Sequence, residues 1–409
     1  MIPSTHQIHG AIQVAETTPV LSDTWVRDFS LTWINRFSFF FAHHLTRPLL
    51  PLYLVSFGAS STVVGAVIGI FTVTSTVMRV PVGLYIDRLG RKPFLFYGLA
   101  CLTAANFGYF WAPSILLIIP CRILHGAGWS GCSTAISTLA ADIAPRARRG
   151  ELIGYAGMAS SLAGSLGPVA GFALFDVSGY SGVFLGAGGL LILALFLSKI
   201  VPEPKNALSS ERIGHWTEAL VVRETLMPAI AAAFLSFGQG GTLTFLPMHA
   251  IHLGLRNPGL WFGLYAFCLL LSRPIAGPLS DRISRRAVII PGLIMHMTSF
   301  VLLALANSTT LLWIAAVIGG MGVGAAQPAL MTLSVDQTAP QRRGQSMAQY
   351  QCFYDLGIGI GSLSLGVLLD LTEQSFMLMY LTTAAVSLLG LCYYNTKSNL
   401  PLPLDSFAA

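Results

Sequence analysis

One carboxylic acid stands alone in an apolar, glycine-rich stretch in the last third of the chain. The stretch "CFYDLGIGIGSLSLG" covers residues 352–366, and Asp355 is its only charged residue. Asp355 lies eleven residues after Gly344, which is ~16 Å along a helix that rises ~1.5 Å per residue. In lipid such an acid costs at least ~2–3 kcal/mol, and it usually lines a cavity or a proton path. Asp355 is therefore either a proton-coupling group or the permanent partner of an arginine, with Arg36, Arg47 and Arg122 as candidates.

A second candidate group is cationic and lies near the start of the chain. The segment "NRFSFFFAHHLTRPLLPLYL" contains Arg36, His43, His44 and Arg47. Arg36, Phe40, His43 and Arg47 are spaced four, three and four residues apart, so they share one face of a helix. A positive face in a cavity favours ligands with carboxylate or phosphate groups. The histidines could contact such a ligand, carry protons or simply pack between helices.

These residues belong to long apolar segments. Of the 409 residues, 54% are hydrophobic and 10% are charged, whereas globular domains have about 25% charged residues. Apolar runs of about 20 residues are typical of membrane-spanning helices. We predict an all-α membrane protein with twelve transmembrane helices, at roughly 29–54, 62–85, 93–111, 114–141, 151–175, 181–200, 226–251, 259–280, 287–306, 309–335, 345–369 and 375–395.

The basic residues between these spans predict the orientation. They cluster in the loops after spans two, four, eight and ten and around the central linker, while the opposite loops contain only Arg256. The positive-inside rule therefore places both termini in the cytoplasm. The net charge of +6 reflects this topology, and we do not expect nucleic-acid binding. The six cysteines all fall in predicted spans without metal-ligand spacing, so we expect packing roles and no metal site.

The two halves of the chain repeat each other. The segment "RVPVGLYIDRLGRK" at 79–92 aligns without gaps with "RPIAGPLSDRISRR" at 273–286, and "DIAPRARRG" at 142–150 aligns with "DQTAPQRRG" at 336–344. The same offset matches Asp355 with Ser161, so the repeat does not explain the acid. We predict two pseudo-symmetric six-helix bundles at 25–201 and 226–396, with a tail at 1–24, a linker at 202–225 and a tail at 397–409. Parallel repeats of this kind place a substrate path between the halves.

The segment "GLYIDRLGRK" at 83–92 resembles the G-x-x-x-D-R-x-G-R-R/K signature of the major facilitator superfamily, and the copy after span eight has Ser284 in place of the glycine. The resemblance covers nearly the whole chain. It implies secondary transport by alternating access, without nucleotide hydrolysis, and a central cavity lined by span one. We find no G-x-x-x-x-G-K-[ST] phosphate loop and expect neither an enzyme nor a cofactor. The expected cavity residues are Arg36, His43, Arg47, Arg122, His125, Gln239 and His249.

Three local patterns add to this resemblance. The signature residues can form a conformational latch on the cytoplasmic side, or they can simply anchor the loops; they are Gly83, Asp87, Arg88, Arg91, Asp142, Asp281, Arg282, Arg285 and Asp336. We expect the Asp87 carboxylate to accept hydrogen bonds from backbone amides at the start of the next helix.

The segment "RILHGAGWS" at 122–130 resembles the R-x-x-x-G-x-G pattern of span four. "GSLGPVAG" at 164–171 resembles an antiporter motif, or is only glycine-rich packing, with Gly164, Gly167, Pro168 and Gly171.

Together these features predict a proton-driven exporter of a small amphipathic or anionic organic compound. The alternative is a solute importer driven by protons, or a transporter-like receptor. The expected partners are the small-molecule substrate, protons and the lipid bilayer, with the chain acting as a monomer. We expect it in the plasma membrane, which in bacteria is the inner membrane.

Overall fold

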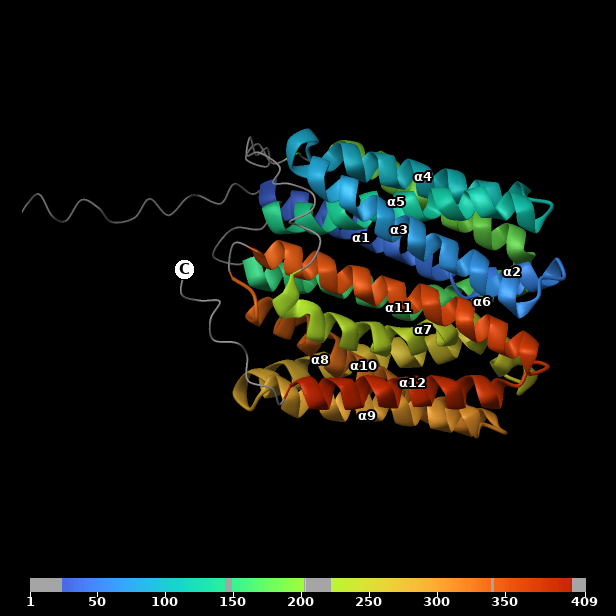
Figure 1. The fold of residues 1–409 in the computed structure, drawn as a ribbon. Helices are drawn as coiled ribbons and strands as arrows, with labels where there is room; N and C mark the ends of the chain where they lie inside the picture. Colours follow the sequence, from blue (N-terminus) through green and yellow to red (C-terminus); the bar gives the residue numbers. More distant parts are fainter. Residues whose placement is uncertain (1–23, 144–148, 202, 204–221, 340–341, 399–409) are drawn as a thin grey trace, which may run out of the picture.

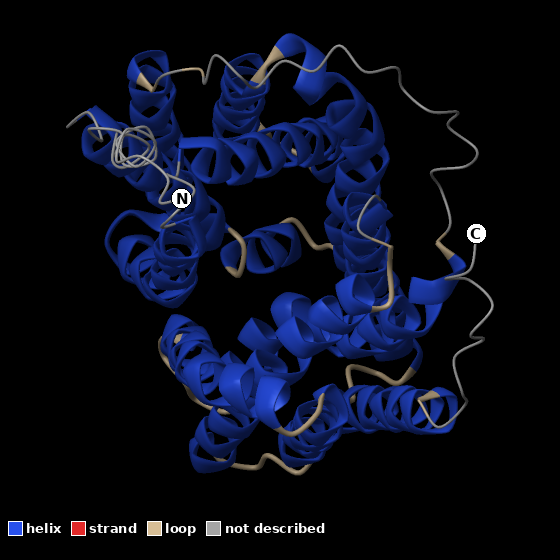
Figure 2. Ribbon diagram, turned by 90° about the vertical axis from the view of Figure 1, so that its left-hand side faces the viewer, coloured by secondary structure: helices blue, strands red, loops and turns tan. Residues whose placement is uncertain are grey.

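A computed structural model describes residues 24–143, 149–201, 203, 222–339 and 342–398. The described residues form helices joined by short loops and contain no strand (Figure 2). Because lipid offers no hydrogen-bond partners, an apolar chain must satisfy its backbone within each helix. Nearly all of the predicted tail at 1–24, most of the linker at 202–225 and most of the tail at 397–409 lie outside the described residues.

The helices fall into two sets. The first half contains α1 (Thr24–Thr46), α2 (Leu49–Ser56), α3 (Ser61–Leu89), α4 (Arg91–Trp111), α5 (Ile115–Ile143) and α6 (Arg149–Ile200). After a short 3₁₀ turn (Arg223–Thr225), the second half contains α7 (Leu226–His252), α8 (Pro258–Arg282), α9 (Arg285–Ala304), α10 (Thr309–Asp336), α11 (Arg343–Leu371) and α12 (Phe376–Lys397). Figure 1 shows α3, α4 and α5 of the first set, in blue to teal, above α9, α10 and α12 of the second set, in yellow to red.

Two helices differ from the predicted spans. The span expected at 29–54 is divided, because α1 ends at Thr46 and α2 begins after Pro48. Proline has no backbone N–H to continue the helical hydrogen bonds, which accounts for the break. Conversely, α6 covers the two spans expected at 151–175 and 181–200, with non-helical backbone angles at Gly179 (φ 64°).

The helix α6 is a hairpin that reverses near Gly179. The Trp33 Nε1–H of α1 donates to the Tyr155 carbonyl at one end of α6, at 2.9 Å. The neighbouring Asn35 Nδ2–H donates to the Ala194 carbonyl near its other end, at 2.8 Å. Both ends of α6 therefore lie beside the same turn of α1. The left-handed φ of Gly179, which costs glycine little, makes the reversal possible.

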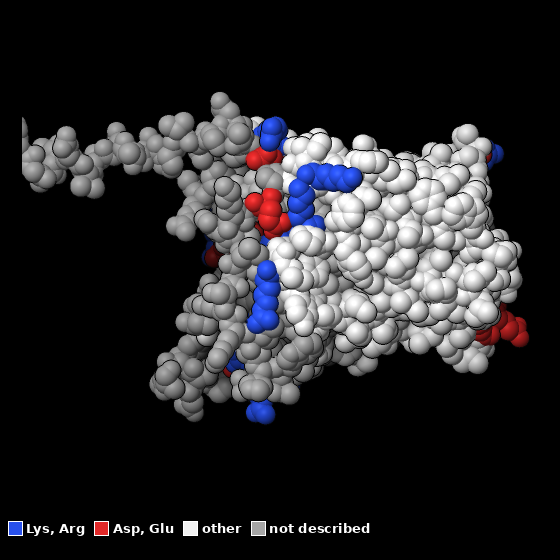
Figure 3. Space-filling view, turned by 90° about the horizontal axis from the view of Figure 1, so that it is seen from above, with Lys and Arg blue, Asp and Glu red and all other residues white. Residues whose placement is uncertain are grey.

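The helices are suited to a lipid bilayer. By length and composition, ten of the described helices can cross a membrane; α6 counts once among them and α1 is not included. With α6 as two spans and α1–α2 as one, the arrangement is consistent with twelve. In Figure 3 the charged residues gather mainly towards one end, beside a broad uncharged surface. The chain is an integral membrane protein.

The internal repeat is visible in the helix boundaries. The helices α4, α5 and α6 begin at Arg91, Ile115 and Arg149, and α9, α10 and α11 begin at Arg285, Thr309 and Arg343. The offset between each pair is the same, so the structure repeats with the register of the sequence. We call the end where α3 and α8 finish the basic end, and the other the opposite end.

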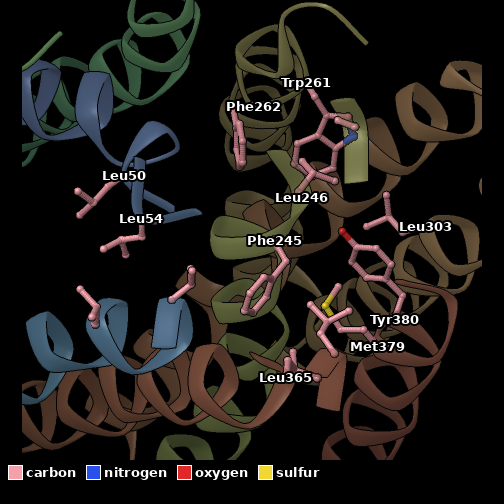
Figure 4. Packing of buried hydrophobic residues seen from close by; sticks show 14 of the residues in the cluster. Leu50, Leu54, Phe245, Leu246, Trp261, Phe262, Leu303, Leu365, Met379 and Tyr380 are labelled. Carbon is pink, nitrogen blue, oxygen red and sulfur yellow. The ribbon is translucent and has the colours of Figure 1, made fainter. Parts of the chain in front are cut away.

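The two halves pack tightly at the opposite end. One buried apolar cluster contains Leu50 and Leu54 of the first half together with Phe245, Trp261 and Leu365 of the second (Figure 4). Across the halves, α3 packs on α11 and α6 packs on α8. A Cβ at Gly65 or Gly366 would collide with the backbone of the facing helix. Small residues thus allow close contact here.

Glycines of the same helices are not packed against a neighbour at the basic end. A Cβ added at Gly83 or Gly277 would meet no atom within 4 Å, and the same holds for Gly154 of α6 and Gly344 of α11. These glycines belong to the helices that pack across the halves at the opposite end. Close glycine contacts between the halves are therefore a feature of the opposite end, and these four glycines form none at the basic end.

Candidate functional site

A central cavity of about 460 Å³ lies between the two halves. Its walls come from α1, α5 and α6 of the first half and from α7, α8, α10 and α11 of the second. The aromatic side chains of Phe40, Trp129, Phe262, Tyr265 and Tyr354 form much of the lining. A cavity of this size, mostly apolar with a few polar groups, suits a small organic molecule.

The charged side chains that line the cavity are all cations. They are Arg36 in the middle of α1, Arg47 directly after α1 and Arg273 of α8. No aspartate or glutamate lines the cavity among the described residues. Within the described part of the chain, none of the three guanidinium groups forms a salt bridge. Arg36 is held by serines instead, donating to Ser160 Oγ at 2.8 Å and to Ser137 Oγ at 3.2 Å.

Gln239, another residue expected from the sequence to line a substrate cavity, lies in the wall of this cavity. Its Oε1 accepts from the Tyr354 hydroxyl at 2.6 Å. Its Nε2 is buried without a hydrogen-bond partner among the described residues. A buried donor without an acceptor is costly, so this amide could donate to a ligand in the cavity.

The histidine of α1 that faces the cavity is not the one predicted for the stripe of Arg36, Phe40, His43 and Arg47. His44 lines the central cavity together with Arg36, Phe40 and Arg47, whereas the predicted His43 does not. Positions 43 and 44 both lie three or four residues from their neighbours in the stripe, so spacing alone could not separate them. The helix rotation is set by packing, since Gly167 of α6 sits against the His44 backbone.

His43, Arg122 and His125 form a separate buried cluster behind the cavity. His43 Nδ1 lies 3.2 Å from His125 Nε2, and the Tyr109 hydroxyl lies 3.1 Å from His125 Nδ1. Arg122 donates to the carbonyls of Val67 and Ile68, both at 3.2 Å, and its guanidinium lies over the ring of Phe71. The prediction that these three line the central cavity is wrong. Arg47 and Leu243 line both the central cavity and a small void of about 30 Å³ beside this cluster.

His249 is also outside the central cavity. It lies near the end of α7, with its ring stacked on Phe376 at 4.8 Å and near Tyr380 at 5.4 Å. It was predicted as a cavity residue, but the last turns of α7 belong to the closed opposite end. Its environment fits a packed aromatic side chain.

Asp355 is paired with an arginine that was not among the candidates. Its Oδ2 accepts from Arg79 Nη2 at 2.9 Å, and its Oδ1 accepts from Gln351 Nε2 at 2.9 Å. The expected partners Arg36, Arg47 and Arg122 form no salt bridge with it. Asp355 faces α3 because α11 crosses α3 along much of its length. The pair joins the two halves. The side chain of Asp355 is 14% exposed and that of Arg79 is 18% exposed.

The signature residues form ion pairs at the basic end of each half. Arg91 Nε lies 3.0 Å from Asp142 Oδ2. In the second half, Arg285 Nε lies 2.9 Å from Asp336 Oδ2, and the same guanidinium contacts Asp281. Further residues of this set are exposed near these pairs, namely Gly83, Arg88 and Arg282.

A residue of the central linker caps α4. Glu203 accepts from the backbone amides of Arg91 and Lys92, at 2.6 and 2.7 Å. These are the amides that the sequence assigned to Asp87, whose side chain lies outside the described residues. A carboxylate at a helix N-terminus is favoured by the unpaired amides and the helix dipole. The prediction missed Glu203 because capping across many residues leaves no local pattern.

The glycine motif of α6 packs this helix against α1. A Cβ at Gly167 would lie 2.7 Å from His44 Cβ, and one at Gly171 would collide with the Leu45 carbonyl. Gly164 and Pro168 line the central cavity. The motif therefore positions the cavity face of α1.

The comparisons with known proteins agree with this architecture. The family model described as Major Facilitator Superfamily matches residues 32–258 and 257–406. The multidrug resistance protein MdtG of Escherichia coli O9:H4 (strain HS) is 26% identical over 396 residues, covering 92% of this chain and 96% of MdtG. An uncharacterized MFS-type transporter of Methanocaldococcus jannaschii is 26% identical over 351 residues, covering 83% and 90%.

Solved structures share the fold at low identity. A bacterial homologue of the human lysosomal transporter Spinster superposes with a TM-score of 0.78 at 14% identity, covering 92% of this chain and 97% of that one. The nucleoside transporter NupG gives a TM-score of 0.78 at 14% identity, covering 90% and 99%. The relatives and the fold are those of transporters, not enzymes. The chain belongs to the major facilitator superfamily and is a membrane transporter of small molecules.

Proposed function

We propose that this transporter exports small amphipathic organic anions in exchange for protons. The observation that supports it best is the lining of the central cavity, where three arginines lie beside aromatic side chains and pair with no carboxylate of the described residues. Guanidinium groups bind anionic oxygens, and aromatic rings bind apolar bodies. Export is favoured by the likeness to a multidrug resistance protein and by the glycine motif of α6.

Proton coupling is assigned to Asp355. The Arg79–Asp355 pair links α3 to α11 across the halves. Protonation of Asp355 would remove the charge that holds Arg79, so proton binding would weaken this contact. A contact whose strength depends on the proton can bias an alternating-access equilibrium.

The basic end carries the proposed latch. The pairs Arg91–Asp142 and Arg285–Asp336 hold adjacent helices within each half. We place this end and both termini on the cytoplasmic side of a bacterial inner membrane, because the basic residues gather there. On this assignment the cavity is open towards the cytoplasm, as an exporter requires when it loads. The transporter acts as a monomer, since both walls of the cavity come from one chain.

Reconstituted liposomes test the direction and the coupling. Naphthalene-2-sulfonate is a suitable probe, because it is amphipathic and remains anionic, so it does not cross the bilayer as a neutral acid. An antiporter accumulates the probe when the lumen is acidic, whereas a symporter accumulates it when the outside is acidic. Accumulation under the second gradient would support an importer. No concentrative uptake under either gradient would contradict proton-driven transport of such anions.

A further inference from the structure

The internal repeat produces two related arginine contacts between the halves. In the first, Arg79 of α3 meets Asp355 of α11, with 2.9 Å between Nη2 and Oδ2. In the second, Arg273 of α8 meets Ser161 of α6, with 3.5 Å between Nη1 and Oγ. Arg273 aligns with Arg79, and Ser161 aligns with Asp355. The second contact therefore has a hydroxyl where the first has a carboxylate.

Arg273 lacks an anionic partner where one would be most favourable. Among the described residues it forms no salt bridge, and its contact with Ser161 is at the limit of hydrogen-bond length. The other charged groups of the central cavity, Arg36 and Arg47, are also cations. A cation between helices in a membrane is stabilised by an anion brought close to it. The positive charge of Arg273 is thus not balanced by an anionic group of the described residues, and an anionic ligand would balance it.

Arg273 also lies on a route into the central cavity. It lines that cavity and a second one of about 460 Å³ towards the basic end. Gln327 of α10 is the other residue that lines both. The acid in the second cavity, Asp281, is paired with Arg285. A solute that enters from the basic end therefore meets Arg273 at the junction.

We propose that Arg273 and Ser161 bind the anionic head group of the transported solute. The head group, a carboxylate, phosphate or sulfonate, takes the place of the carboxylate that Asp355 supplies in the related contact. The apolar body then lies against Phe262, Tyr265 and Trp129 in the central cavity. Because Arg273 and Ser161 belong to different halves, a bound anion links α8 to α6. The inference rests on the proposed transport of organic anions and assigns the residues that select the charge.

Binding measurements test the assignment without transport. Naphthalene-2-sulfonate and its neutral counterpart naphthalene-2-sulfonamide are titrated by calorimetry into the protein in lipid nanodiscs. Wild type should bind the anion about tenfold tighter or more than the amide, as expected for a charge-assisted contact. Arg273→Gln should remove this preference while leaving the affinity for the amide unchanged.

A second variant keeps Arg273 and places a carboxylate beside it. Ser161→Asp restores the carboxylate of the related contact, so the guanidinium becomes paired within the protein and the anion preference should again be lost. Arg256→Gln removes an exposed arginine outside both cavities. It controls for the change in net charge and should keep the preference for the anion. If Arg273→Gln does not fold, Ser161→Asp decides the question.

The outcomes separate this inference from the proposed function. Should either variant keep the full preference for the anion, the assignment of Arg273 and Ser161 is wrong, while anion selectivity stands and belongs to Arg36 or Arg47. If wild type itself does not prefer the anion, both the assignment and the proposed anionic substrate are wrong. Loss of the preference in both variants with an unchanged Arg256→Gln supports the inference.

Discussion

At the scale of single residues, the Arg79–Asp355 pair is the charged link between the halves. The carboxylate uses both oxygens, one for Arg79 and one for Gln351. Asp355 lies about 18 Å along α11 from its start, at ~1.5 Å per residue, and both side chains of the pair are mostly buried. Its protonation state therefore acts directly on the contact between α3 and α11.

We expect Asp355→Asn to abolish accumulation driven by a proton gradient. Asparagine keeps the size and one of the two acceptor oxygens but has no carboxyl group to titrate, so the contact no longer responds to pH. Exchange of labelled for unlabelled solute, which needs no proton, should persist. Both are measured in liposomes that contain the variant, with naphthalene-2-sulfonate as the solute.

The matched control is Glu224→Gln, which neutralises an exposed acid of the turn before α7. It should transport like wild type. Concentrative transport by Asp355→Asn at the wild-type level would exclude Asp355 as the coupling group.

At the scale of helices, glycines of α6 determine how closely it packs on α1. A Cβ at Gly167 would lie 2.7 Å from His44 Cβ. Overpacking of this kind typically costs about 1–3 kcal/mol. Gly167→Ala should therefore lower the thermal unfolding temperature of the purified protein, and it should also displace His44 from the cavity wall.

The same helix offers the control. A Cβ at Gly154 would meet no atom within 4 Å, so Gly154→Ala should be neutral or should stabilise by up to about 1 kcal/mol through helix propensity. Equal unfolding temperatures for the two variants would show that the α1–α6 contact tolerates a methyl group.

At the scale of the whole molecule, one acid links the two halves at the opposite end. Asp370 at the end of α11 accepts from the backbone amides of Ser61 and Thr62 at the start of α3, at 2.9 and 2.8 Å. Gln374 adds a hydrogen bond to the Ser61 hydroxyl. An alternating-access transporter must break these contacts to open this end.

Asp370→Ala should shift the population towards molecules open at this end. Spin labels at Ser60 and Glu373, on the two sides of the contact, should report a longer distance by pulsed electron resonance. Asp176→Ala is the control, because Asp176 aligns with Asp370 in the repeat but is exposed and, among the described residues, accepts no hydrogen bond from the other half. An unchanged distance in Asp370→Ala would mean that the apolar cluster alone keeps this end closed.

The sequence alone determined the features that follow from short-range patterns. Hydropathy predicted the helices, because a backbone in lipid has few other options. The gapless repeat predicted the two related halves, and it matched Asp355 with Ser161. The spacing of the α1 stripe predicted that Arg36 and Arg47 share a face, and both line the central cavity.

Only the tertiary structure decided the features that depend on contacts between distant helices. It paired Asp355 with Arg79, chose His44 rather than His43 for the cavity, and placed Arg122 and His125 behind it. Helical spacing tells which residues share a face, but the rotation of each helix depends on how its glycines meet the next helix. That packing joins residues far apart in the chain, so no local pattern records it.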